Sequence, residues 1–304
     1  NQIEFPYNLK KLQDPYKPYK ILKSTPFGIT YTKDLAIELI EKEQLGKDEI
    51  TDYLNISFTP TQEIGDKFGN MSMEVEDAYI RLDYELMFFI NYLETYIGKE
   101  NFLLVLTSNH GVATSAKYEL QTNVESGIFK SVEYMYLLEK HLDTSFGEDN
   151  WVEYYYAQQI YLNQTAISNK HIPLEDIQQS AIDFLIQING IQQIMKSTDL
   201  QKNSFICGGM DEKIDNSYNQ NRSGDLFIQF KPGWTEQSTD VVATHTSGYN
   251  YDSHIPLLWY GWKMQAKNIT LPISITDIIV SLCNITNTPL PNMANGKNIQ
   301  GLVE

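Results

Sequence analysis

Three polar groups in this sequence contain residue types that ligate metals or carry protons. In chain order they are Gln62 with Glu63 and Asp66, Asn109 with His110, and His245 with Asp252 and His254. Histidine and carboxylate side chains from separate loops are what α/β enzymes bring together to build metal sites. On residue type alone, a single histidine more often bonds a backbone carbonyl than a metal. A metal site is therefore a hypothesis that depends on whether the fold joins the three groups.

A strand–loop–helix–strand segment is predicted to bring the first two groups together. Residues 52–58 are a strand candidate, 59–70 are a loop with two glycines, and 102–107 are a buried strand. Apolar residues recur at three- and four-residue steps over 74–97, which predicts an amphipathic helix between the strands. The two strands should then be parallel, with the loop and the turn at 108–111 facing one another at their carboxyl edge. Ligand sites in open α/β sheets lie at this edge.

The rest of the chain is predicted to surround this segment. The expected helices are 32–46, 124–142, 174–187 and 274–285, and the expected strands are 152–162, 225–230 and 255–261. The less regular region 112–224 is interpreted as an insertion or cap, after which the chain returns to its core. We therefore predict a single, partial domain over residues 1–304.

Charge and composition exclude several classes of protein. The 304 residues carry a formal net charge of −16, which disfavours nucleic acid and anionic membranes as partners. No apolar run is long enough to span a bilayer. The two cysteines, Cys207 and Cys283, cannot form a disulfide framework, and two unpaired thiols are expected. The chain begins at Asn1, which we interpret as a processed product, a trimmed chain or a fragment.

Six runs of sequence resemble the alkaline phosphatase superfamily. They are STPFG (24–28), EQLGKDEITDYLNISF (43–58), IGDKFGNMSMEVEDAYIRLD (64–83), LLVLTSNHG (103–111), RSGDLFIQFKPGW (222–234) and HTSGYNYDSHIPLLWYG (245–261). They follow the family's order and span most of the chain, which resembles the C-terminal part of phosphate-irrepressible zinc alkaline phosphatases related to the type I phosphodiesterases and nucleotide pyrophosphatases. The resemblance implies an α/β fold with a mostly parallel sheet, flanking helices and a cap-like insertion. It also implies that the N-terminal part of the family domain is missing.

The resemblance assigns a family position to five of the polar residues. In the family, two zinc ions activate a Thr or Ser nucleophile and bind phosphoryl oxygens. The positions of the first zinc are occupied here by Gln62, Asp66 and His254, and those of the second by Asn109 and His110. The nucleophile and one acidic ligand of the family have no counterpart here, so the catalytic residue is unknown.

The replacements change the chemistry that the resemblance implies. Gln62 and Asn109 place amides where the family has carboxylates, and Asp66 places a carboxylate where it has a histidine. Neutral amides are poor zinc ligands and offset none of the repulsion between two dications. We therefore expect one zinc ion or none, with a harder ion on Asp66, Asp252 and amide oxygens as an alternative. His245 is expected beside a phosphate-like ligand or a neighbouring loop, whereas Asp252 would cap the turn before a strand.

Three hypotheses about function follow from this resemblance. The first is a degenerate, pseudophosphatase domain that binds or scaffolds; the alternative is an active phosphomonoesterase or phosphodiesterase with altered metal ligands. The third is one component of a larger assembly, whose partner is another protein chain or the chain's own N-terminal segment. A phosphate ester is the expected class of ligand, and the resemblance implies a periplasmic or extracellular location.

Overall fold

The computed structural model of the chain describes residues 6–202, 209–236, 242–243, 245 and 247–303. It divides into two compact units. The first unit comprises Asn1–Pro60, Ala78–Ser108 and Pro256–Glu304, and the second comprises Thr61–Asp77 and Asn109–Ile255. None of the described helices is long and apolar enough to cross a membrane. Cys207 lies outside the described residues, and Cys283 is a buried free thiol.

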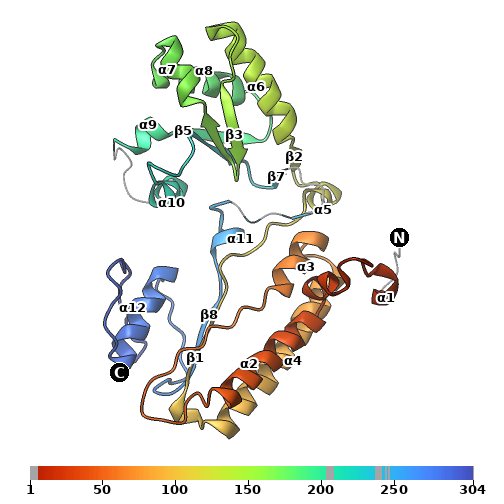
Figure 1. The fold of residues 1–304 in the computed structure, drawn as a ribbon, viewed down its shortest axis with the longest axis vertical. Coiled ribbons are helices and arrows are strands. Elements are labelled where there is room, and N and C mark those ends of the chain that lie inside the picture. The colour runs from red at the N-terminus through yellow and green to blue at the C-terminus, as the bar shows by residue number, and fades with distance from the viewer. Residues whose placement is uncertain (1–5, 203–208, 237–241, 244, 246, 304) are drawn as a thin grey trace. The chain divides into compact units, whose positions relative to one another are not determined.

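Helices and one short sheet make up the first unit (Figure 1). Its elements are α1 (Leu9–Leu12), η1 (Pro18–Ser24), α2 (Phe27–Lys42), most of α4 (Met73–Tyr96), η2 (Lys99–Asn101), β1 (Leu103–Thr107), β8 (Leu257–Gly261) and α12 (Ile275–Thr286). In Figure 1, β1 and β8 run between α12 on one side and α2 and α4 on the other. Ala36 and Ile40 of α2 pack with Phe89 and Leu93 of α4 to form the unit's buried cluster.

The long periodic helix and the closing helix are confirmed with their expected ends. The Ser72 hydroxyl accepts a hydrogen bond from the backbone N–H of Val75, and Gly98, at φ 96°, follows α4. Ser274 and Asp277 form a capping box at the start of α12. These ends satisfy backbone N–H groups that have no partner within the helix.

The strand expected at 52–58 is not formed. Residues 51–58 belong to no helix or strand. The exposure of residues 53–58 alternates, but among the described residues 51–57 make no backbone–backbone hydrogen bond. Strand β1 instead pairs antiparallel with β8, from Leu103 opposite Gly261 to Thr107 opposite Leu257. The expected parallel pair is therefore absent from the described part of the chain.

The second unit is built around a four-stranded antiparallel sheet in the order β3-β4-β6-β5. Its elements are α3 (Pro60–Phe68), α5 (Ala116–Gln121), β2 (Gly127–Phe129), α6 (Ser131–Phe146), β3 (Val152–Tyr156), β4 (Gln159–Leu162), α7 (Gln164–Lys170), α8 (Leu174–Leu185), β5 (Ile191–Lys196), α9 (Ser197–Leu200), α10 (Gly209–Ser217), β6 (Leu226–Phe230), β7 (Trp234–Glu236) and α11 (Asn250–Ser253). Helices α6 and α8 bury Leu138, Leu142 and Ile177 against this sheet. Strands β2 and β7 form a separate parallel pair.

The prediction of one strand over 152–162 was wrong. The chain turns back at Ala157 and Gln158, both at positive φ, and so forms the hairpin β3–β4. The interpretation of 112–224 as a cap stays a prediction, as does the single partial domain over 1–304. The sheet that fills this region also includes β6, which begins at Leu226.

The loop expected at 59–70 is a helix over most of its length. Pro60 begins α3, where its missing N–H costs nothing and its fixed φ suits a first helical turn. Gly69, at φ 84°, follows the helix in the left-handed conformation that favours glycine. Gly65 lies inside the helix, so the two glycines that suggested a loop have different roles.

Candidate functional site

His110 and His245 lie face to face in the second unit. Their ring centroids are 3.6 Å apart and their planes differ by 4°. Nδ1 of His245 lies 3.3 Å from Oδ1 of Asp66. The two atoms are close, but their geometry is not that of a hydrogen bond. The three side chains form a carboxylate–imidazole–imidazole row.

Helix α3 fixes the position of Asp66 in this row. Gln62 and Asp66 are four residues apart on the helix and thus lie on the same face. The Asp66 carbonyl accepts hydrogen bonds from the backbone N–H groups of Val242 and Ala243, at 2.6 and 3.2 Å. These bonds hold the end of the helix against the segment that leads to His245.

Asp252 is buried next to the two histidines. Its side chain is 3% exposed, and Oδ2 accepts hydrogen bonds from the backbone N–H and the hydroxyl of Ser247, at 2.9 and 2.6 Å. Oδ1 is also buried and has no hydrogen-bond partner among the described residues. Burial raises the pKa of Asp252, while the Ser247 bonds and the nearby His245 and His110 act in the opposite direction. Asp252 therefore caps its turn through Oδ2, as expected from the sequence. Its Oδ1 accepts no hydrogen bond from the described residues.

Gly111 connects the turn after β1 to α11. Its N–H donates to the carbonyl of Asp252 at 2.7 Å. A Cβ at this position would lie 2.1 Å from the carbonyl oxygen of Tyr251, so a side chain is excluded by the backbone itself. This close approach explains the glycine after His110 and sets that histidine beside the Asp252 loop.

Sequence reasoning missed two residues that support the site. Ser247 holds the carboxylate of Asp252, and Lys213 of α10 donates from Nζ to the Gly248 carbonyl at 2.6 Å and to the Ser253 hydroxyl at 2.8 Å. Nothing in the sequence near Lys213 predicts that it reaches this loop.

Three of the expected ligand positions do not join the row. Gln62, Asn109 and His254 have exposed side chains, and His254 follows α11 at its C-terminal end. Among the described residues, no hydrogen bond, ion pair or ring contact links these side chains to the row. The structure brings together Asp66, His110, His245 and Asp252 instead.

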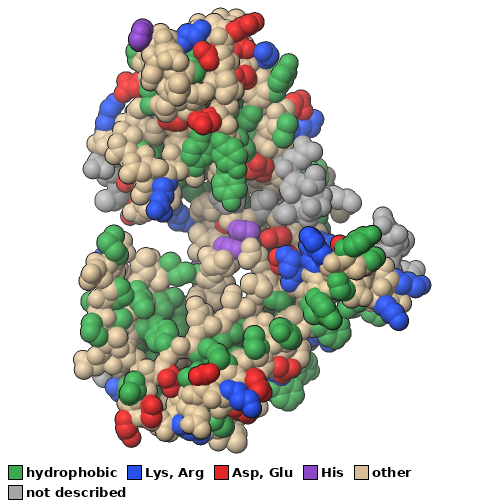
Figure 2. All heavy atoms as spheres, viewed as in Figure 1, with side chains coloured by type: hydrophobic (Ala, Val, Ile, Leu, Met, Phe, Trp, Pro, Cys, Tyr) green, Lys and Arg blue, Asp and Glu red, His purple; other side chains and the backbone are tan. Residues whose placement is uncertain are grey.

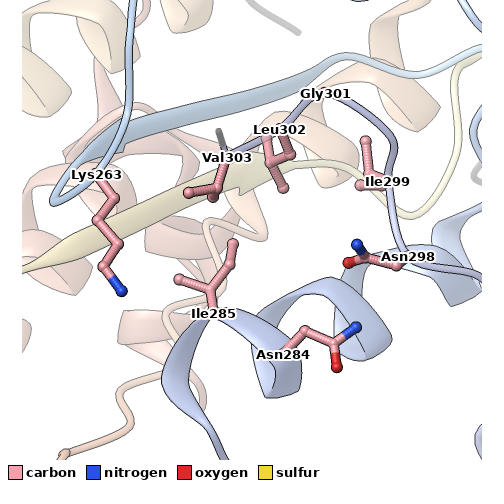
Figure 3. A pocket seen from close by; sticks show the side chains of 8 residues that line it. All are labelled: Lys263, Asn284, Ile285, Asn298, Ile299, Gly301, Leu302 and Val303. Atoms are coloured by element: carbon pink, nitrogen blue, oxygen red, sulfur yellow. The ribbon is translucent and has the colours of Figure 1, made fainter.

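A pocket of about 230 Å³ lies elsewhere, in the first unit (Figure 3). It is lined by Lys263, Asn284, Ile285, Asn298, Ile299, Gly301, Leu302 and Val303. None of these belongs to the three polar groups of the sequence. The candidate site is therefore defined by its polar row and not by this pocket.

Comparison with known proteins decides the family. The model of the type I phosphodiesterase / nucleotide pyrophosphatase family matches residues 5–250. The chain belongs to this family. The match confirms the resemblance to this family.

Alkaline phosphatases are among the curated relatives. The chain is 33% identical over 301 residues to the alkaline phosphatase PafA of Elizabethkingia meningoseptica, covering 98% of this chain and 54% of that protein. It is 30% identical over 305 residues to the alkaline phosphatase PhoV of Synechococcus elongatus, covering 99% and 53%. A Myroides odoratus protein named as a calcium-transporting ATPase is 33% identical over 303 residues, covering 99% and 55%. The chain thus spans about half the length of the curated relatives it matches.

A solved structure confirms the alkaline-phosphatase-like α/β fold. The crystal structure of wild-type PafA matches with a TM-score of 0.88 and 30% identity, covering 94% of this chain and 55% of that one. Murine ectonucleotide pyrophosphatase / phosphodiesterase 5 matches with a TM-score of 0.61 and 14% identity, covering 90% of this chain and 64% of that one, which supports the fold alone. The family fold is therefore present even though the described strand pairs of this chain are mostly antiparallel.

The residues present do not fit the two-zinc centre of the family. At two of the positions that the resemblance assigns to carboxylates the sequence has amides, Gln62 and Asn109, and His254 does not join the row. Among the described residues, no three His, Cys, Asp or Glu side chains lie together in a way that could hold a metal ion. We therefore assign no step of phosphate-ester chemistry to zinc.

Proposed function

We propose that this chain forms part of a phosphoric ester hydrolase whose ligand set differs from the family's two-zinc centre. The family match over residues 5–250 carries the proposal, and the named alkaline phosphatases among the relatives support it. The expected class of substrate is a phosphomonoester or phosphodiester.

The polar row gives this chain two groups that suit a phosphate ester. An imidazole whose one nitrogen faces a carboxylate can donate a hydrogen bond from the other to a phosphoryl oxygen. His245 has this arrangement, with Asp66 at 3.3 Å from Nδ1. We assign ester binding to His245 and the stacked His110, and we assign the orientation of His245 to Asp66.

Restoring the family's ligand types tests this proposal. Turnover of p-nitrophenyl phosphate and bis-p-nitrophenyl phosphate is measured for the protein and for the triple variant Gln62→Asp, Asp66→His, Asn109→Asp. A hydrolase adapted to its present residues loses at least about tenfold in kcat/KM, because Asp66 no longer orients His245. A triple variant that gains activity over an inactive parent would refute the proposal.

A degenerate, pseudophosphatase domain with a binding or scaffolding role is the second candidate. The amides at Gln62 and Asn109 favour it, because both remove a negative charge that a dication needs. This candidate predicts that the protein binds inorganic phosphate or a phosphate ester without hydrolysing it. Calorimetric titration with inorganic phosphate, beside the turnover assay, separates the two candidates.

Partners and location are also proposals. The resemblance supports a periplasmic or extracellular location, which fractionation of expressing cells would test. It also supports a polypeptide partner, in the form of another protein chain or a further segment of the same protein. The net charge of −16 argues against nucleic acid.

A further inference from the structure

The cavity of about 230 Å³ in the first unit has a wall of apolar side chains (Figure 3). Ile285 of α12 contributes to this wall, and Ile299, Leu302 and Val303 contribute from the segment that follows the helix. Ile299 and Leu302 are buried, whereas Ile285 and Val303 are half-buried. An apolar group that displaces water from such a wall is stabilised, because apolar surface is removed from water on both sides. The cavity therefore favours a ligand with an apolar body.

Hydrogen bonds to α12 hold this wall in place. The backbone N–H of Lys297 donates to Oδ1 of Asp277 at 2.7 Å. The backbone N–H of Ile299 donates to the Ser281 hydroxyl at 2.9 Å, and this hydroxyl donates to the Asp277 carbonyl at 2.8 Å. A wall that is fixed before the ligand arrives lowers the entropy cost of binding. The cavity is thus a preformed site.

A tight turn after β8 carries the cation of the cavity. The backbone N–H of Met264 donates to the carbonyl of Gly261 at 3.0 Å and closes a four-residue turn. Lys263 is the third residue of this turn and has a φ of 60°, in the left-handed region that glycine and asparagine favour. Residues held in this region gather at ligand sites, where the surrounding structure compensates the strain. A lysine is therefore unusual at this position of a turn, and it is one of the residues that line the cavity.

The ammonium group of Lys263 is available to an anion. Its Nζ lies 4.0 Å from the centroid of the Trp262 ring. With the described residues it forms no ion pair and no hydrogen bond. An ammonium group that rests on a ring face keeps N–H donors for a carboxylate.

The surroundings of Lys263 are otherwise uncharged. None of the eight residues that line the cavity is acidic, and Lys263 is the one cation among them. Asp277 is the one charged residue of α12, and its carboxylate accepts hydrogen bonds from the backbone N–H groups of Ser274 and Lys297. Figure 2 shows mainly hydrophobic and uncharged side chains over the visible side of α12. The lining of the cavity therefore has one positive charge and no carboxylate to balance it.

We propose that this cavity binds a small organic monocarboxylate. Its apolar body lies against the isoleucine and leucine side chains of the wall. Its carboxylate accepts hydrogen bonds from Nζ of Lys263 and from the side-chain amide of Asn298, which lie on opposite sides of the cavity in Figure 3. One cation balances one negative charge, which favours a carboxylate over the dianion of a phosphate.

The size of the cavity limits the ligand further. Its volume of about 230 Å³ is below the roughly 300–1,000 Å³ of sites for drug-sized ligands, so the ligand is of the size of benzoate. The cavity lies in the first unit, and none of its residues belongs to the polar row. The inference therefore does not rest on the proposed hydrolase function.

Ligand-observed NMR titration of the full chain tests the chemistry of the ligand. The probe is benzoate, and the controls are acetate, which lacks the apolar ring, and benzyl alcohol, which lacks the charge. We expect benzoate to bind one-to-one with a Kd of about 1 mM or tighter, and each control to bind at least about tenfold more weakly. The absence of saturable benzoate binding would overturn the inference, as would equal affinity for either control.

The variant Lys263→Met tests the cation, with Lys267→Met as its matched control. Both lysines are exposed, but Lys267 does not line the cavity. Methionine keeps most of the length of the side chain and removes its charge. Lys263→Met should weaken benzoate binding about tenfold, because a charge-assisted hydrogen bond is lost, and Lys267→Met should not. Equal affinity of the two variants contradicts the role of Lys263, with thermal unfolding as a check on folding.

Two further variants locate the ligand. Val303→Phe should weaken benzoate binding at least about fivefold, because the larger ring occupies the cavity. Unchanged affinity in a folded Val303→Phe protein would overturn the inference. His245→Gln should leave benzoate binding unchanged, and loss of binding in this variant would place the ligand at the polar row instead. Benzoate binding by a protein that hydrolyses no phosphate ester supports this inference and counts against the proposed hydrolase alone.

Discussion

Gly111 is the residue on which the geometry around His110 most depends. Any Cβ here would lie 2.1 Å from the Tyr251 carbonyl oxygen, so Gly111→Ala forces the turn and the Asp252 loop apart. We expect the variant to lower the free energy of unfolding by about 2–3 kcal/mol, the range for a clash that backbone must absorb. Urea unfolding followed by circular dichroism measures this change.

Gly65→Ala is the matched control for that variant. A Cβ at Gly65 meets nothing within 4 Å, and the residue lies inside α3. Alanine should therefore raise the free energy of unfolding by about 0.5–1 kcal/mol, because it lowers the entropy cost of the helix. Equal effects of the two substitutions would contradict the close approach of Gly111 and Tyr251.

Asp252 predicts a specific dependence of stability on pH. Burial raises its pKa in the folded state, so the native state binds the proton more tightly than the unfolded chain does. Its contribution to stability is full below the ordinary aspartate pKa and is lost as pH rises through the raised pKa. Asp252→Asn keeps an acceptor for Ser247 and removes the titration, so its free energy of unfolding should lack this decline.

Urea midpoints between pH 3.5 and 7 measure that difference. The control is Asp83→Asn, which removes the same charge from an exposed position. The Asp83→Asn profile should parallel that of the unchanged protein across the range. An unchanged profile in Asp252→Asn would show that Asp252 does not titrate as its burial implies.

Residue types and spacing predicted part of the site. His110 follows the strand β1, which is half-buried, and the polar run 243–254 contains His245 and Asp252, which the structure brings close to His110. The expected partnership with His254 is not seen, because its exposure depends on how α11 ends. The role of Lys213 was not predicted either, because its hydrogen bonds reach residues that are 35 and 40 positions away in the sequence.

At the scale of elements, the helices with a clear apolar period could be predicted from the sequence, but the pairing of the β-strands could not. The 74–97 pattern corresponds to α4 because its apolar period and its ends agree. Residues 52–58 have the correct strand alternation, but a strand also needs a neighbour, which sequence alone does not supply. The prediction of a loop at 59–70 is wrong because Gly65 lies inside helix α3, whereas Pro60 begins the helix and Gly69 follows it.

The β3–β4 hairpin contains strain that sequence changes should relieve. Ala157 and Gln158 adopt φ of 48° and 64°, although residues with a Cβ disfavour this region. Two-residue hairpin turns of this kind favour Asn-Gly. The double variant Ala157→Asn, Gln158→Gly should raise the free energy of unfolding by about 1 kcal/mol, measured in urea.

Ala157→Val is the opposing variant in the hairpin. A β-branched residue suits the left-handed region even less than alanine, so it should lower the free energy of unfolding. If both variants had the same sign of effect, the turn would not have the conformation described.

At the scale of the whole molecule, the sequence predicted the family and the α/β class. Motifs that follow one another over most of the chain carry that information, and the match to the type I phosphodiesterase family confirms it. The division into two units was not predicted, because it depends on how segments distant in sequence associate. Phosphate-ester chemistry stays our proposal, which the family match supports.

The zinc content of the protein tests the central claim most directly. Mass spectrometry of the metal after equilibration with zinc and desalting counts the ions that remain bound. The amides at Gln62 and Asn109, and the separation of His254 from the polar row, predict fewer than two zinc ions per chain. Two tightly held zinc ions per chain would contradict the account.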